Sequence, residues 1–236
     1  MLRRNVVRFV ILFPGRTGST FLVSALDAHP AIEAKGEVLD GLRSQGSDAQ
    51  RAWLDRYFRA PLVGRHRAVG FKTKLRDVFD QEHLAQTIAE YDARVVVLDR
   101  RNDVKHAVSR ITARVLRERT GRWNRYEGSQ ELGLIQVDPE DFSQRLRAVA
   151  EEKQVIRSFA DSLGRPYLDL DYEDLLEDPD AAFGRVFDLL GVHRLQVQGS
   201  TLKNTSDDLG EVISNYEDLR SRYVGTVYEP MFDEGR

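Results

Sequence analysis

The chain has 236 residues, of which 41% are hydrophobic and 31% are charged. This composition excludes a disordered chain, a collagen-like chain and a disulfide scaffold. The net charge of −3 argues against a nucleic-acid partner, and the absence of cysteine excludes thiol catalysis. No apolar run approaches the ~20 residues of a transmembrane segment, and the N-terminal stretch reads as a strand, not a signal peptide. We therefore expect one cytoplasmic domain over residues 1–236, with its oligomeric state left open.

Short apolar runs alternate along the chain with longer helical patterns. The runs predict strands at 6–13, 68–74, 94–98 and 167–170. Helices are predicted at 19–28, 49–59, 81–91, 138–163 and 181–190, and another through Val104, Val108, Ile111 and Val115. Strands that alternate with helices predict an α/β fold in which a central parallel sheet has helices on both faces.

The segment from Phe13 to Thr20 joins the first predicted strand to the first predicted helix. Its two glycines permit a tight turn with backbone N–H groups pointing into one concavity, at the positive end of a helix. Arg16 adds a cation, and two hydroxyl residues follow. The loop is not a Walker A motif, because Ser19 stands where that motif has lysine. These features predict a phosphate or sulfate cradle, although they also suit an ordinary turn.

A basic segment follows the predicted strand at 94–98. Residues 94–125 contain ten Lys or Arg and only three Asp or Glu. Ligands of open parallel sheets bind beyond the carboxyl ends of the strands, so this segment predicts an anionic ligand. A solvated basic helix is the alternative.

Two of these segments resemble motifs of one enzyme family. The run Gly15–Leu22 resembles the 5′-phosphosulfate loop of sulfotransferases that use 3′-phosphoadenosine 5′-phosphosulfate (PAPS), and Arg101 with Ser109 is similar to their 3′-phosphate motif. Weaker matches lie at 172–175, 201–204 and 213–216. Arg16 and the Gly-Glu pair after the first helix make the chain most similar to bacterial and Golgi-type carbohydrate sulfotransferases, including types that sulfate nodulation factor or trehalose.

The resemblance implies a P-loop-like sulfotransferase fold and an enzyme that transfers a sulfuryl group from PAPS to an acceptor hydroxyl. The acceptor would be a carbohydrate, a glycolipid or a small metabolite. Arg16 is expected to act on the leaving phosphate, with Arg100 an alternative to Arg101 at the 3′-phosphate. No metal is expected, since the transferred group carries less charge than a phosphoryl group. The residues implied in binding PAPS are Gly15, Arg16, Thr17, Gly18, Ser19, Thr20, Arg101, Ser109 and Lys203.

Three more residues are candidates for contact with the acceptor. The resemblance implies that Glu37 is the general base that takes the proton of the acceptor hydroxyl. Lys72 and Lys74 alternate along a predicted strand and therefore share one face, where they would meet the sulfuryl group or an anionic acceptor. A loop glutamate and exposed lysines on an edge strand are the alternatives.

Two other functions remain open at this point. One is an ATP-dependent P-loop kinase, in which Asp99 at the end of a strand would imitate the Walker B aspartate. The other is a non-catalytic nucleotide-binding module that lacks a working base at Glu37.

Overall fold

The computed structural model describes residues 6–59, 66–123, 132–199, 206 and 208–234. The chain divides into two compact units. We call residues 1–99 with 153–200 the sheet unit, and residues 100–152 with 201–236 the helical unit. The expectation of a single domain remains a prediction, since compact units need not fold independently.

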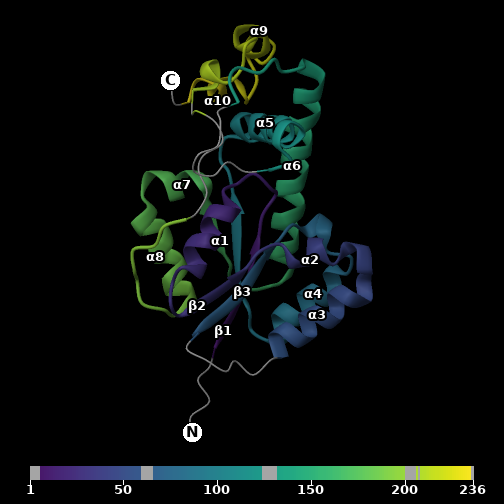
Figure 1. Cartoon of the computed structure of the whole chain (residues 1–236), viewed down its shortest axis with the longest axis vertical. Helices are drawn as coiled ribbons and strands as arrows, with labels where there is room; N and C mark the ends of the chain where they lie inside the picture. Colours follow the sequence, from purple (N-terminus) through teal and green to yellow (C-terminus); the bar gives the residue numbers. More distant parts are fainter. Residues whose placement is uncertain (1–5, 60–65, 124–131, 200–205, 207, 235–236) are drawn as a thin grey trace. The chain divides into compact units, whose positions relative to one another are not determined.

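The sheet unit is built on five parallel strands, β1 (Val7–Leu12), β2 (Ile32–Lys35), β3 (Ala68–Thr73), β4 (Arg94–Asp99) and β5 (Leu168–Asp171) (Figure 1). Their order is β2-β3-β1-β4-β5. Leu12 of β1 pairs with Thr73 of β3, so the segments that follow these two strands emerge together. The predicted α/β class with a central parallel sheet is confirmed.

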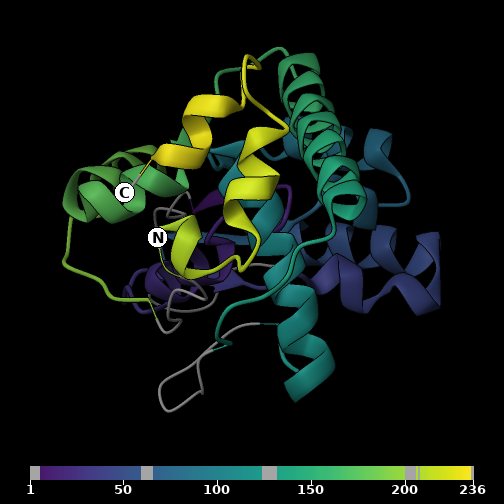
Figure 2. The ribbon, with the colours of Figure 1, turned by 90° about the horizontal axis from the view of Figure 1, so that it is seen from above.

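Helices cover both faces of this sheet. One face carries α1 (Ser19–Asp27), α7 (Tyr172–Glu177) and α8 (Pro179–Leu190); the other carries α3 (Ser47–Arg59) and α4 (Gln81–Glu90) (Figure 1). Viewed from above, the green α8 and the dark blue α3 lie on opposite sides (Figure 2). Alternate residues of β1 enter the two cores: Phe9 packs with the α1 and α8 side, and Val10 with the α3 and α4 side. Successive side chains of a strand point to opposite faces, so a strand in a sheet that is covered on both faces places apolar residues in both cores.

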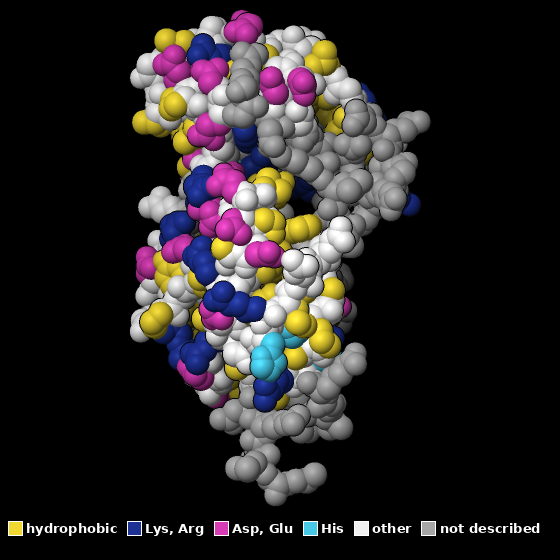
Figure 3. Space-filling view, turned by 90° about the vertical axis from the view of Figure 1, so that its left-hand side faces the viewer, with side chains coloured by type: hydrophobic (Ala, Val, Ile, Leu, Met, Phe, Trp, Pro, Cys, Tyr) yellow, Lys and Arg dark blue, Asp and Glu magenta, His cyan; other side chains and the backbone are white. Residues whose placement is uncertain are grey.

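The outer surface formed by α7 and α8 mixes both signs of charge (Figure 3). Arg185 pairs with Asp174 at 3.2 Å, and Arg194 pairs with Asp188 on the same side of the sheet unit. Exposed pairs of this kind each contribute roughly 0–1 kcal/mol. This face therefore presents no patch of a single charge sign.

The helical unit has a core of its own. It contains α5 (Asp103–Thr120), most of α6 (Pro139–Ser162), α9 (Tyr216–Ser221), α10 (Glu229–Asp233) and a short 3-10 turn, Leu209–Glu211. Asn102 caps α5 by accepting from the Lys105 amide at 2.7 Å, and its side-chain amide donates to the Met231 carbonyl at 2.7 Å. The cap therefore ties the start of α5 to α10. The largest buried side chains of this core are Phe142, Phe232, Tyr216, Ile111 and Ile213.

Every helix and strand predicted with bounds is present, with ends that differ by two residues or fewer. The helix predicted through Val104 to Val115 is α5, which continues to Thr120. The predictions missed β2, α2 (Val38–Gly41), α7, α9 and α10. The short 3-10 turns Arg43–Gln45 (η1) and Leu75–Asp77 (η2) were also not predicted. In the part of the chain that is described, no helix is both long and apolar enough to cross a bilayer.

Candidate anion-binding and catalytic site

The loop between β1 and α1 bends through left-handed backbone. Gly15, Arg16 and Gly18 have φ angles of 65°, 64° and 72°. Glycine adopts these angles without strain. Arg16 has a Cβ atom, so the same left-handed conformation costs it about 1–2 kcal/mol. The helix α1 starts at Ser19 without a side-chain cap, so its first N–H groups lack a side-chain acceptor. Such a turn at a helix start has the form of an anion-binding nest.

The start of α7 packs directly on this loop. A Cβ atom built on Gly18 would lie 2.5 Å from Cδ2 of Tyr172, closer than any side chain tolerates. Because the ring lies this close to Gly18, it fixes the shape of the loop. Tyr172 is also the first residue of the weakly matching motif at 172–175. Gly18 is required both for its φ angle and for this close approach.

Substituting Gly18→Ala is expected to lower the free energy of unfolding by about 2–4 kcal/mol, because left-handed strain and a clash with Tyr172 add together. Gly164→Ala is the matched control, since Gly164 has φ 63° and a Cβ added there would meet nothing within 4 Å. Urea unfolding of both variants measures the difference. Equal losses for the two would show that the Tyr172 contact does not constrain the loop.

Lys72 brings an ammonium group to the hydroxyls of the loop. It projects from β3, is 4% exposed, and donates to Oγ of Ser19 at 3.1 Å and to Oγ1 of Thr20 at 2.9 Å. β3 lies between β2 and β1, so the alternative of exposed lysines on an edge strand is wrong. The loop lacks the Walker lysine, yet a neighbouring strand supplies a cation to the same place.

Glu37 lies against both lysines. One carboxylate oxygen is 3.3 Å from Nζ of Lys72, and the other accepts a hydrogen bond from Lys74. Burial would raise the pKa of Glu37, but the two ammonium groups outweigh it and hold that pKa below its usual range. Burial, together with the charges of Lys74 and Arg16, lowers the pKa of Lys72. Glu37 is half-buried and paired with two lysines, which differs from the alternative of an exposed loop glutamate.

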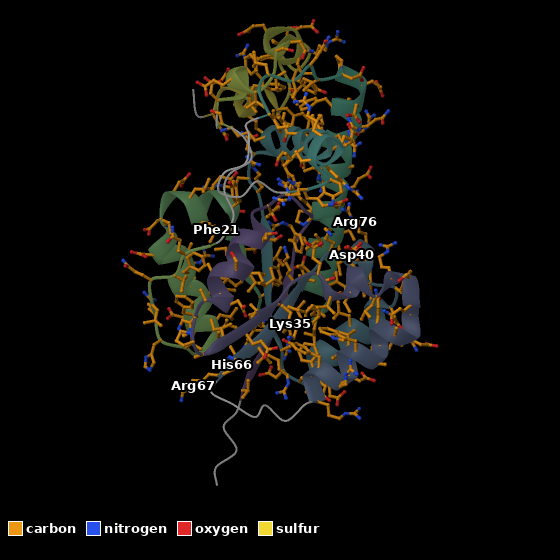
Figure 4. All side chains as sticks on the ribbon, viewed as in Figure 1. Phe21, Lys35, Asp40, His66, Arg67 and Arg76 are labelled. Atoms are coloured by element: carbon orange, nitrogen blue, oxygen red, sulfur yellow. The ribbon has the colours of Figure 1, made fainter. Side chains whose placement is uncertain are left out.

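Lys74 is shared with a second carboxylate. Its ammonium lies 3.1 Å from Oδ2 of Asp77, and Oδ1 of Asp77 accepts from Arg43 at 2.8 Å. Burial lowers the pKa of Lys74, yet Glu37 and Asp77 together raise it above its usual value. Figure 4 marks this region by the labels of Asp40 on α2 and Arg76 on the turn after β3. The predicted candidates Glu37, Lys72 and Lys74 thus form one network, at the same strand ends as the loop.

The carboxylates of Glu37, Asp40 and Asp77 offer oxygens within 4.8 Å of one another. Such a grouping can hold a metal ion, and it could not be seen in the sequence because Asp77 is distant in the chain from Glu37 and Asp40. Here the Lys74 ammonium already contacts two of the three carboxylates. The expectation that no metal is required stays a prediction.

One buried atom of the loop is suited to receive a ligand. Thr17 is fully buried, and within the described part of the chain its Oγ1 has no hydrogen-bond partner. Buried hydroxyls are nearly always satisfied. An orphaned hydroxyl beside a nest of backbone N–H groups and the Lys72 cation fits a phosphate or sulfate oxygen.

Comparison with known proteins gives a consistent relationship. No family model matches the sequence. Nodulation protein H of Rhizobium tropici is 25% identical over 236 residues, and the alignment covers 95% of this chain and 92% of the relative. Nodulation protein H of Rhizobium meliloti (strain 1021) is 24% identical over 238 residues, and the alignment covers 95% of this chain and 94% of the relative. A sulfotransferase from Alicyclobacillus acidocaldarius superposes with a TM-score of 0.52 at 21% identity, covering 95% of this chain and 92% of that one. The chain has the sulfotransferase fold.

The sulfotransferase fold confirms the resemblance inferred from the loop and from the Arg101–Ser109 motif. Arg101 and Ser109 belong to the helical unit, where Arg101 is exposed and precedes α5, and Ser109 is buried within α5. Arg100 is buried, at 6% exposure. Their roles at a 3′-phosphate stay predictions, and Lys203 lies outside the described residues.

Three residues of this sulfotransferase-fold site were missed from the sequence. Asp77 and Arg43 lie on turns that carry no motif, and Tyr172 was noted only within a weak match. The one available signal was the acid in Arg76-Asp77, three residues after Lys74. The pairing of β3 with β2, and the position of α2, bring Asp77 and Arg43 to Glu37, whereas Tyr172 meets the loop at Gly18.

Proposed function

We propose that this protein is an enzyme of the sulfotransferase class that moves a sulfuryl group from PAPS to a hydroxyl of a carbohydrate acceptor. The observation that carries the proposal is the position of Lys72. Its ammonium contacts the hydroxyls of the anion loop on one side and the Glu37 carboxylate on the other. An anion cradle and a candidate base thus share one cation.

The loop is suited to hold the phosphosulfate end of PAPS. Its positive φ angles, the uncapped start of α1 and the orphaned hydroxyl of Thr17 all favour an anionic ligand. In this proposal the backbone and side chains of 15–20 bind that end, while Arg101 and Ser109 bind the 3′-phosphate. Lys203 is kept as a late-chain contact on the family resemblance alone.

PAPS supplies an activated sulfuryl group whose transfer leaves negative charge on the phosphate oxygens. Arg16 and Lys72 carry positive charge to the region where that charge develops. Fixed cations in a buried site stabilise such charge strongly, because the protein does not need to reorganise around it. A metal ion is not needed for this role.

In this proposal Glu37 takes the acceptor proton. A carboxylate has about four lone-pair positions, and its contacts with Lys72 and Lys74 use one oxygen each. An acceptor hydroxyl can therefore donate to Glu37 while both lysines stay in place. Glu37 is also 29% exposed in its side chain, so the acceptor can approach it from solvent.

Two observations support a carbohydrate as the acceptor. The Arg16 loop and the Gly36-Glu37 pair resemble types that sulfate nodulation factor or trehalose, and two relatives over 95% of the chain are named nodulation protein H. The first support comes from two local motifs, and the second extends the similarity over 95% of the chain.

A P-loop kinase is the competing function. It would need Asp99 to hold magnesium, but Asp99 is paired with Lys153 at 3.0 Å and with Arg157 at 3.5 Å. The carboxylate is thus neutralised by this chain's own cations. The loop also lacks the Walker lysine. A non-catalytic nucleotide-binding module remains the second competitor, and turnover distinguishes it.

The desulfated nucleotide 3′-phosphoadenosine 5′-phosphate is expected to bind at least tenfold more tightly than AMP. A charge-assisted contact to the extra phosphate contributes roughly 1.5–3 kcal/mol. Titration calorimetry with both nucleotides measures the difference. Equal affinities would remove the case for a 3′-phosphate site at Arg101 and Ser109.

The same nucleotide also separates the two enzyme classes. It should raise Tm more than ATP with magnesium does, because the loop is built for a phosphosulfate without a metal. A larger rise with ATP and magnesium would favour the kinase.

A further inference from the structure

Two carboxylates compete for one ammonium group beside the candidate base. Lys74 donates to Glu37 and lies 3.1 Å from Oδ2 of Asp77. Glu37 also faces Lys72 at 3.3 Å. A base held by two lysines alone would be strongly stabilised in its charged form and would accept a proton poorly. Asp77 changes that balance, because it attracts one of the two ammonium groups.

Asp77 is fixed in place from several sides. It is 5% exposed, and Arg43 donates to its other carboxylate oxygen at 2.8 Å. The buried amide of Gln50 donates to the backbone carbonyls of Asp77 and Leu39, each at 2.7 Å, and accepts from the Phe79 amide at 3.0 Å. Gln50 thus ties the turn that carries Asp77 to α2, the helix that directly follows Glu37.

We propose that Asp77 is a positioning residue for the reaction: by holding one side of the Lys74 ammonium, it limits how tightly that ammonium pairs with Glu37 and keeps the carboxylate available as a base. This inference rests on the proposed role of Glu37. Asp77 acts on Glu37 through the shared Lys74 ammonium and also by direct repulsion, since carboxylate oxygens of the two lie within 4.8 Å of each other, and it touches no reacting atom. Arg43 opposes it, because Arg43 neutralises part of the Asp77 charge.

The charged groups around Glu37 give the sign of each effect. Lys72 and Lys74 are the cations that contact Glu37, and Asp77 and Asp40 are the anions beside it. Arg43 pairs with Asp77, the charge of Arg16 acts on Lys72, and the Arg76 side chain lies with that of Lys74 against Gly15. Removing Asp77 leaves Lys74 to Glu37 alone, so the carboxylate becomes a weaker base. Removing Arg43 has the opposite effect, because Asp77 then draws Lys74 more strongly.

The test is a pH titration of the Glu37 side-chain carboxyl carbon by NMR, which does not depend on turnover. Asp77→Asn is expected to move the Glu37 midpoint down by ~1 pH unit, and Arg43→Gln to move it up by ~0.5 unit. Arg43 is 43% exposed in its side chain, so Arg43→Gln keeps the test available even where Asp77→Asn folds poorly. Opposite shifts are the signature of this electrostatic role.

Two further variants sharpen the result. In a Lys74→Met background, Asp77→Asn should move the midpoint less than it does in the wild type, because only the direct repulsion between the two carboxylates remains. An undiminished shift would contradict the route through Lys74. Asp40→Asn is the matched control: its carboxylate lies in the same cluster but makes no ion pair among the described residues, so its shift should be smaller than that of Asp77→Asn. Equal shifts for Asp40 and Asp77 would overturn the proposal.

Kinetics then connects the titration to the reaction. With PAPS and a chitooligosaccharide, the acid limb of kcat/KM should move with the Glu37 midpoint in each variant. A fall in kcat for Asp77→Asn without any shift of the midpoint would mean a structural role only, and would overturn the inference. Shifts in the midpoint combined with full activity of Glu37→Gln would instead refute the proposed base, leaving the Asp77 effect intact.

Discussion

Replacing Glu37 with glutamine is expected to lower kcat by ~10²–10⁴-fold while leaving the affinity for 3′-phosphoadenosine 5′-phosphate nearly unchanged. Glutamine keeps the size of the side chain and one acceptor oxygen, but it takes up no proton at neutral pH. The nucleotide contacts proposed for residues 15–20 do not include Glu37. Steady-state kinetics and calorimetry on the same preparation separate the two effects.

Glu33→Gln is the matched control for this substitution. Glu33 lies on β2, four residues earlier, and pairs with Lys35 at 2.7 Å. It should keep turnover within about twofold of the wild type, as surface changes away from a site usually do. Wild-type turnover in Glu37→Gln would show that the base lies elsewhere.

The pH dependence of turnover follows from the same carboxylate. Lys72 and Lys74 hold the pKa of Glu37 below its usual range against the effect of burial. The base is active when deprotonated, so kcat/KM should stay high as the pH falls and drop only below the range of an ordinary glutamate.

Replacing Lys72 with methionine is the second change with a large expected effect. Methionine has a similar length but carries no charge, so the variant removes a cation that contacts both the loop hydroxyls and Glu37. Loss of a fixed charge aimed at a developing anion typically costs ~10²–10³-fold in kcat. Tm is measured on the same variant, because removing one partner of a buried ion pair lowers stability even though Glu37 keeps Lys74.

Lys35→Met serves as its control, since Lys35 lies 42% exposed on β2 and pairs with Glu33. Figure 4 labels Lys35 on this strand. Unchanged turnover in both lysine variants would place the reacting centre away from Lys72.

Much of the site was predictable because its parts are local. The loop from Phe13 to Thr20 is one unbroken run of sequence, and the alternation of Lys72 with Lys74 puts both on one side of the chain. The apolar run at 94–98 and the periodic helices gave the α/β class for the same reason. Each of these signals lies within a short window of sequence.

The rest depends on contacts between distant segments. The strand Ile32–Lys35 is short and half-buried, and its pairing with β3 stabilises it more than its own composition does. Asp77 lies forty residues after Glu37, so no spacing rule connects them. That Lys72 is internal, and not on an edge, follows only from the strand order.

The central claim is sulfuryl transfer to a sugar, and the most direct measurement is the movement of a radiolabelled sulfuryl group from PAPS to a chitooligosaccharide or trehalose. The wild-type enzyme should label at least one of these sugars without added metal, and Glu37→Gln should label it at least a hundredfold more slowly. No labelled sugar from PAPS, together with labelling of the same sugars from γ-labelled ATP and magnesium, would contradict the account and identify a kinase.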